Sequence, residues 1–141
     1  MIKVFISQPM RGKSEEEILL TRTLLKRLIQ GKLSGCCEII DSYFEEYPEA
    51  EGHKNIALKY LAKSIDKLAD ADLFLQLKDY DAGSQRGCMI ELECAREYGL
   101  LIHCCTVNDI IECATEAEVE ALLNYRNAWR MKKHDLVVSK G

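Results

Sequence analysis

The chain has 141 residues, of which 48% are hydrophobic and 30% charged, and its formal net charge at pH 7 is -4. This composition is typical of a globular protein, and the length fits one domain over residues 1–141. The acidic balance and the lack of a Lys/Arg cluster exclude a binder of DNA or RNA polymers. No apolar run reaches the roughly 18 residues of a membrane span, and the apolar start is too short for a signal peptide. We therefore expect a soluble, cytoplasmic protein with no membrane partner.

The first half of the chain predicts two strand–helix units. Residues 2–6 are mostly apolar, as in a buried parallel strand, and the polar loop 7–13 ends this strand. Ser14 and Glu17 have the spacing of a capping box, and apolar residues at helical spacing carry the first helix to about Gln30. A short strand, an acidic and aromatic loop and a second helix follow, over residues 37–40, 41–48 and about 55–69.

The second half of the chain repeats this alternation. In order, it predicts a strand over 73–77, a polar segment over 78–85, a helix over 87–98 and a strand over 100–107. Thr115 then caps a last helix, which we expect to extend through Leu123, with Glu118 at the capping-box position. The tail 124–141 is mixed and basic, and its residues 135–139 predict an additional edge strand.

Strands that alternate with helices indicate an α/β fold. We expect a flavodoxin-like doubly wound parallel sheet with strand order 2-1-3-4 and helices on both faces. In such a sheet, ligands bind outside the carboxyl ends of the strands, where the strand order reverses. The loops after the first and third strands, residues 7–13 and 78–87, are therefore the predicted site.

The seven cysteines show no metal-binding or redox pattern. Their number is odd, and no pair has the C-x-x-C spacing of zinc and thiol–disulfide sites. Cys36 and Cys37, like Cys104 and Cys105, are adjacent residues at or near predicted strands, so their side chains point to opposite faces. We interpret the cysteines as small buried side chains in a reducing compartment, and we expect no metal and no cofactor.

Glu91 occupies an unusual place in the predicted third helix. A helical wheel puts Cys88, Leu92, Ala95 and Tyr98 on one side of this helix, and Glu91 falls inside that apolar arc. A carboxylate in such a place is costly unless it is paired or reaches a cleft. Glu91 is therefore a candidate catalytic nucleophile or general acid/base. The alternative is an acid in the first turns that only complements the helix dipole.

Three loops carry side chains suited to a nucleotide-like ligand. At the start of the third helix, residues 84–87 include Arg86 and Gly87, which offer a guanidinium and close backbone approach to a phosphate or carboxylate. The other two loops offer polar groups for a sugar or base, and aromatic rings that stack on a base. Their residues are Ser7, Gln8 and Arg11 in the first loop, and Asp41, Tyr43 and Phe44 in the second. Plain polar loops and packed aromatics are the alternative interpretation.

Four blocks of sequence lie around these residues: the opening strand with Gln8-Pro9-Met10-Arg11-Gly12, then residues 39–48, 60–72 and 86–95. Together they resemble nucleoside 2-deoxyribosyltransferases and the small bacterial and phage proteins related to them. In the transferases, the fourth block reads Gly-x-x-x-Glu-x-Gly-x-Ala and its Glu is the nucleophile. By resemblance, Gly87, Glu91 and Ala95 fall on the Gly, Glu and last Ala of that motif. The resemblance covers residues 1 to about 105.

The resemblance implies cleavage or transfer of the N-glycosidic bond of a nucleoside, nucleotide or nucleotide-derived ligand, with Glu91 as nucleophile. It adds Pro9 and Ser64 to the expected ligand-binding residues. Ser64 stands where the transferases carry an Asp, which favours an alternative: a non-catalytic binder that senses or sequesters such a ligand. The opening strand also resembles that of TIR domains, some of which cleave NAD with a helix Glu. The transferase relatives further imply a homo-oligomer, and Tyr125 and Trp129 in the tail are of the type that concentrates in interfaces.

We expect all seven cysteines to be reduced thiols in the native protein, because no spacing supports a disulfide framework. Rapid alkylation of the native protein, followed by unfolding, further alkylation and mass spectrometry, should show seven modified thiols. A stable disulfide or a bound zinc ion under reducing conditions would contradict this expectation.

Overall fold

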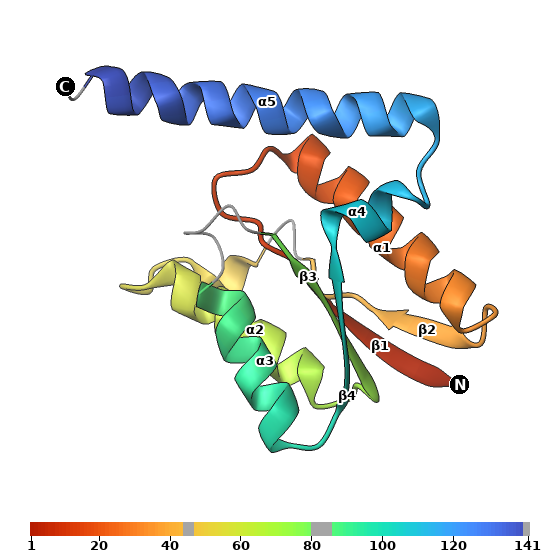
Figure 1. The fold of residues 1–141 in the computed structure, drawn as a ribbon. Coiled ribbons are helices and arrows are strands. Elements are labelled where there is room, and N and C mark those ends of the chain that lie inside the picture. Colours follow the sequence, from red (N-terminus) through yellow and green to blue (C-terminus); the bar gives the residue numbers. More distant parts are fainter. Residues whose placement is uncertain (44–46, 80–85, 140–141) are drawn as a thin grey trace.

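The computed structural model describes residues 1–43, 47–79 and 86–139, with side chains described up to residue 127 of these ranges. Its centre is a parallel sheet of four strands in the order β2-β1-β3-β4 (Figure 1). The strands are β1 (Ile2–Ser7), β2 (Cys37–Ile40), β3 (Leu73–Lys78) and β4 (Leu101–Thr106). The helices are α1 (Glu15–Lys32), α2 (Ile56–Leu68), α3 (Arg86–Glu97), α4 (Val107–Ile111) and α5 (Glu116–Ser139), with a short 3-10 helix, η1, at Pro48–Ala50. The predicted α/β flavodoxin-like fold and its strand order are confirmed.

The helices cover both faces of the sheet (Figure 1). Side chains alternate along a strand, so neighbouring residues of β1 enter different cores. Val4 and Ile6 pack in the core that includes residues of α1, α4 and α5. Phe5 packs in the core shared with α2 and α3, where its ring stacks on Phe74 of β3 with 5.9 Å between the ring centroids. The same alternation places Ser7 on the α2 and α3 side of the sheet.

The helix starts follow the capping signals, with one difference. The side chain of Ser14 accepts a hydrogen bond from the Glu17 backbone N–H, as predicted. The carboxylate of Glu17, however, contacts Lys13 at 3.2 Å, where a capping box would bind it to the backbone of Ser14. Thr115 and Glu118 form both bonds of their predicted capping box, of 2.9 and 3.2 Å. The capped ends satisfy N–H groups that have no partner within the helix.

The C-terminal part of the chain differs from the prediction. Strand β4 ends at Thr106, whose side chain caps the unpredicted helix α4. Helix α5 continues through residues 135–139, so the predicted edge strand there is wrong. No Gly or Pro occurs in α5, and nothing in its sequence ends the helix that starts after Thr115. Neither α5 nor any other helix within the described ranges is long and apolar enough to cross a membrane.

A buried ion cluster fastens the first loop and α5 to the end of β3. Asp79, which directly follows β3, accepts hydrogen bonds from both terminal nitrogens of Arg126 on α5, at 2.8 and 2.9 Å. The ammonium of Lys13 lies 3.2 Å from the carboxylates of Asp79 and Glu17. Burial opposes the ionisation of Asp79, but the hydrogen bonds and charges of Arg126 and Lys13 outweigh it and lower the pKa of Asp79 to about 2. The cluster anchors the loop that carries Gln8 and Arg11.

Replacing Asp79→Asn should lower the free energy of unfolding by about 3 kcal/mol near neutral pH, because it removes one partner of a buried ion pair. The folded-state pKa of Asp79 is lowered, so its contribution is full above the pKa of the unfolded chain and is lost as the pH falls toward 2. Urea denaturation from pH 7 down to pH 2 should therefore show a shrinking difference between wild type and variant. The exposed Asp70→Asn serves as control. A difference that does not change with pH would contradict the role of this cluster.

Candidate functional site

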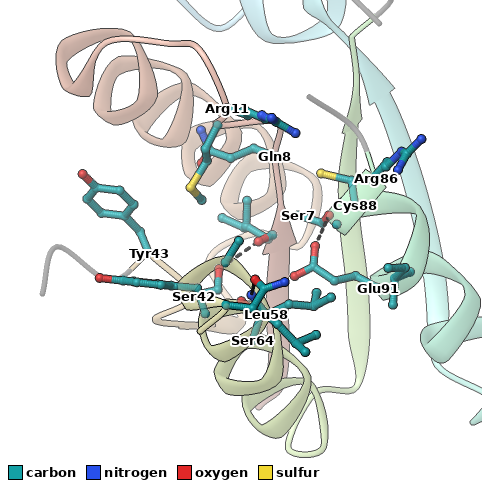
Figure 2. A pocket seen from close by; sticks show the side chains of 18 residues that line it. Ser7, Gln8, Arg11, Ser42, Tyr43, Leu58, Ser64, Arg86, Cys88 and Glu91 are labelled. Carbon is teal, nitrogen blue, oxygen red and sulfur yellow. Dashed lines mark hydrogen bonds between the residues drawn. The ribbon is translucent and has the colours of Figure 1, made fainter. Parts of the chain in front are cut away.

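A cavity of about 540 Å³ lies at the carboxyl end of β1 (Figure 2). Its walls come from the loop after β1, the loop after β2, helix α2 and the first turns of α3. This is the place where the strand order reverses. The chain goes from β1 to β2 on one side of β1 and then crosses to β3 on the other side. The volume lies within the roughly 300–1,000 Å³ that is usual for small-molecule sites. The fold thus forms a cavity where the sequence predicted a site.

Most of the residues predicted for the site line this cavity. They are Ser7, Gln8, Arg11, Tyr43, Ser64, Arg86, Gly87 and Glu91. Pro9 is buried in the first loop and is not among the lining residues, and Asp41 is exposed, where its side chain accepts a hydrogen bond from the Tyr43 backbone. Phe44, Ser84 and Gln85 lie outside the described residues. The structure therefore brings together the first loop, the loop after β2 and the start of α3.

Glu91 is a buried carboxylate in the wall of the cavity. It is 8% exposed, which confirms that it lies on the buried side of α3. Its Oε1 atom accepts a hydrogen bond of 2.7 Å from the hydroxyl of Ser7 (Figure 2). Burial raises the pKa of Glu91 to about 7, although the Ser7 hydrogen bond acts in the opposite direction. Near neutral pH the side chain is therefore present both as a carboxylate and as a carboxylic acid.

Gln76 on β3 holds Ser7, a role that the sequence did not predict. The two residues are partners in the register of β1 and β3. The Nε2 atom of Gln76 donates hydrogen bonds to Ser7 Oγ at 3.3 Å and to the backbone carbonyl of Cys88 at 2.8 Å. A signal was present in the sequence, because a glutamine interrupts the apolar strand Leu-Phe-Leu-Gln-Leu. A polar residue inside a buried strand needs hydrogen-bond partners in the fold.

The first loop and the loop after β2 are held by buried polar contacts. Ser42 donates a hydrogen bond of 2.8 Å to the carbonyl of Ile6 and accepts one of 3.2 Å from Arg22 on α1. Gln8 donates to the carbonyl of Ile18 at 3.1 Å. Within the described part of the chain, Gln8 Oε1 has no hydrogen-bond partner and is left as a buried acceptor beside the cavity. The sequence did not predict Ser42, whose only signal is its place two residues after the end of a strand.

The charges of the cavity favour an anionic ligand. Among the described lining residues the charged side chains are Arg11, Arg86 and Glu91, and the two arginines are exposed. In the view of Figure 2, Arg11 and Arg86 lie on the upper side of the pocket, and Leu58 and Ser64 on the lower side. Arg86 is the first residue of α3, and the first turn of a helix is a place where backbone N–H groups attract an anion. The apolar side chains of Leu58 and Leu61 on α2 suit a planar ring.

The described ranges contain no group of three or more His, Cys, Asp or Glu side chains that could hold a metal ion. The seven cysteines form no disulfide with one another in the structure. Comparison of the chain with models of protein families, with curated proteins and with solved structures gave no match. The arrangement of the cavity residues therefore carries the functional argument.

Replacing Glu91→Gln should change stability in a pH-dependent way. Burial raises the folded-state pKa of Glu91 from 4.5 to about 7. The stability of wild type relative to the neutral variant is therefore greatest below pH 4.5, and it falls as the pH rises through 7. Between pH 4 and pH 8, the free energy of unfolding of the variant should increase relative to that of wild type by up to about 3 kcal/mol. Thermal unfolding at several pH values measures this, with the exposed Glu93→Gln as a matched control. A stability difference independent of pH would show that Glu91 is not buried as described.

Proposed function

We propose that this protein binds a nucleoside, nucleotide or nucleotide-derived ligand in the cavity and cleaves or transfers its N-glycosidic bond, with Glu91 as the nucleophile. The observation that carries this proposal is the buried carboxylate of Glu91 in the cavity wall, with one oxygen held by Ser7. A carboxylate with little solvent around it is a suitable nucleophile when a substrate atom can reach it. The resemblance of the Gly87–Ala95 block to nucleoside 2-deoxyribosyltransferases supports the same reaction class.

In the proposed reaction, the ionised carboxylate of Glu91 attacks the anomeric carbon of the sugar. The bond from this carbon to the base nitrogen breaks, and the base leaves with the electron pair and takes up a proton. The transition state resembles an oxocarbenium ion, as in retaining glycosidases. Water or a second base then attacks the same carbon and releases the Glu91 carboxylate. A pKa of about 7 leaves a sizeable ionised fraction at neutral pH.

The cavity offers a separate place for each part of a nucleotide. Arg11, Arg86 and the backbone N–H groups at the start of α3 suit a phosphate. Gln8 and Ser64 offer hydrogen-bonding groups to the sugar or base, and Tyr43 offers an aromatic ring for stacking. The two arginines favour a ligand that carries a phosphate over a neutral nucleoside.

A second candidate function is binding without turnover. Glu91 is the only carboxylate among the described residues that line the cavity, and the α2 wall presents the hydroxyl of Ser64. Within the described lining there is then no second acid to protonate a departing base, which an efficient N-glycosidase uses as a general acid. This observation favours a protein that captures a nucleotide-derived ligand and releases it unchanged. The homo-oligomer stays a prediction, and the side chain of Trp129 lies outside the described residues.

The Glu91→Gln variant separates these two functions. It keeps the shape of the side chain and removes the attacking charge, so base release should fall by about a thousandfold or more while ligand binding persists. The measurement is incubation with a panel of nucleosides, nucleoside monophosphates and NAD, with chromatography for released base and calorimetry for binding. Glu93→Gln, two positions away on the exposed side of α3, is the matched control and should keep wild-type base release.

Unchanged base release by Glu91→Gln would remove Glu91 from the mechanism. Tight binding of a panel member by the wild type, with no released base, would support the binding function. Neither binding nor turnover with any member of the panel would contradict both functions.

A further inference from the structure

A short chain of hydrogen bonds crosses the floor of the site from β3 to α3. It begins at Gln76 Nε2, passes through Ser7 Oγ at 3.3 Å and ends at Glu91 Oε1, 2.7 Å from the hydroxyl. All three side chains are at least nine-tenths buried. Ser7 and Gln76 face α2 and α3 for the same reason as Phe5 and Phe74, because each follows its phenylalanine by two residues in a strand.

The direction of this chain follows from the chemistry of its members. Gln76 Nε2 also contacts the backbone carbonyl of Cys88 at 2.8 Å, and a carbonyl only accepts hydrogen bonds. The atom at this position must therefore be the amide nitrogen, which has two protons and donates one to each partner. Ser7 Oγ accepts from Gln76 and has a single proton of its own, which it donates to the carboxylate of Glu91.

We propose that Gln76 is a positioning residue that acts on Glu91 through Ser7, by committing the Ser7 proton to Glu91 Oε1 and so leaving the second carboxylate oxygen for the substrate. The hydrogen-bond chain itself can be tested without a ligand, and its consequence for turnover rests on the proposed function. Among the described residues, Oε1 is the only oxygen of Glu91 that accepts a hydrogen bond. Figure 2 shows the other oxygen pointing away from Ser7, toward the pocket.

Without Gln76, the Ser7 hydroxyl loses a hydrogen-bond donor. The amide of Gln76 donates to Ser7 Oγ and so polarises the hydroxyl that donates to Glu91. A Gln76→Leu variant therefore leaves Glu91 with a weaker hydrogen bond from Ser7. A carboxylate that loses a donor is harder to ionise, so the pKa of Glu91 should rise further.

Other titratable or charged groups also lie near Glu91, and their charges bear on its pKa. Among the described residues, the titratable or charged side chains that line the cavity with it are Arg11 on the first loop, Tyr43 after β2, Tyr60 on α2, and Arg86 and Cys88 on α3. Burial raises the pKa of the Cys88 thiol to about 11, so this neighbour stays neutral over the range in which Glu91 ionises. None of these side chains is replaced in the variants used below, and Ser7→Ala also removes the contact between Ser7 and the Cys88 thiol.

A double-mutant cycle tests the proposal. The titration of Glu91 is followed by NMR of protein labelled with carboxyl-carbon-13 glutamate, and the Glu91 signal is identified by its loss in Glu91→Gln. Ser7→Ala and Gln76→Leu should each move the midpoint to higher pH, with the larger shift for Ser7→Ala. In the double variant, the midpoint should equal that of Ser7→Ala alone, because Gln76 acts only through Ser7.

A purely structural role for Gln76 gives a different result. Gln76→Leu would then shift the midpoint by the same amount with Ser7 and with Ala at position 7, and this additivity would overturn the proposal. Gln30→Leu, the same substitution at an exposed position of α1, is the matched control and should leave the Glu91 titration unchanged. If Gln76→Leu does not fold, Gln76→Asn takes its place, since its shorter side chain cannot hold both Ser7 and Cys88.

Activity provides a separate readout. If the protein releases base, Gln76→Leu should lower kcat about 10-fold with little change in KM, because the charge-assisted hydrogen bond from Ser7 to the nucleophile is weakened. The acid side of its pH–rate profile should also move to higher pH. If the protein releases no base, the proposed enzyme activity fails, and the NMR cycle still decides whether Gln76 acts through Ser7.

Discussion

The hydrogen bond between Ser7 and Glu91 connects the end of β1 to α3 across the sheet surface. It exists because β1 and β3 are buried in the middle of a parallel sheet and place Ser7 beside Gln76. The fold needs a polar partner for the buried carboxylate, since an unpaired one would be costly. Burial raises the pKa of Glu91, and the hydrogen bond from Ser7 limits that rise while it holds the carboxylate in the wall of the cavity.

Two buried carboxylates near the first loop have opposite effects on the stability of the folded state at neutral pH. A carboxylate with a raised pKa destabilises the folded state at neutral pH, and such groups are found where chemistry or ligand binding requires them. Asp79 behaves in the opposite way, because Arg126 and Lys13 lower its pKa and make its charge stabilising. Two carboxylates near the carboxyl ends of neighbouring strands thus have different environments, and only Glu91 lines the cavity.

The choice between enzyme and binding protein depends on how the leaving base would acquire a proton. In the proposed reaction Glu91 is the nucleophile, and among the described lining residues α2 presents the hydroxyl of Ser64 and no carboxylate. A base that leaves readily, or one that is protonated by solvent, needs no such acid. Substrates with a positively charged or electron-poor leaving base are therefore the class in which Glu91 alone would suffice.

Local patterns in the sequence determined the elements and the unusual place of Glu91. Alternating apolar residues predict strands, Ser and Thr residues mark helix starts, and a helical wheel places Glu91 on the buried side of α3. These signals extend over a few residues, so they can be recognised without knowledge of the fold. They failed in the tail, because residues 135–139 suit a strand locally but continue a helix that nothing interrupts.

Only the tertiary structure decided which side chains meet. Ser7 and Gln76 are 69 residues apart in the chain, and Arg126 is 47 residues from Asp79. Their contacts depend on the strand register and on the docking of α5 against the end of β3. A shift of one residue in either strand would turn Ser7 or Gln76 to the opposite face of the sheet. The packing of the two cores sets this register, and no local pattern in the sequence records it.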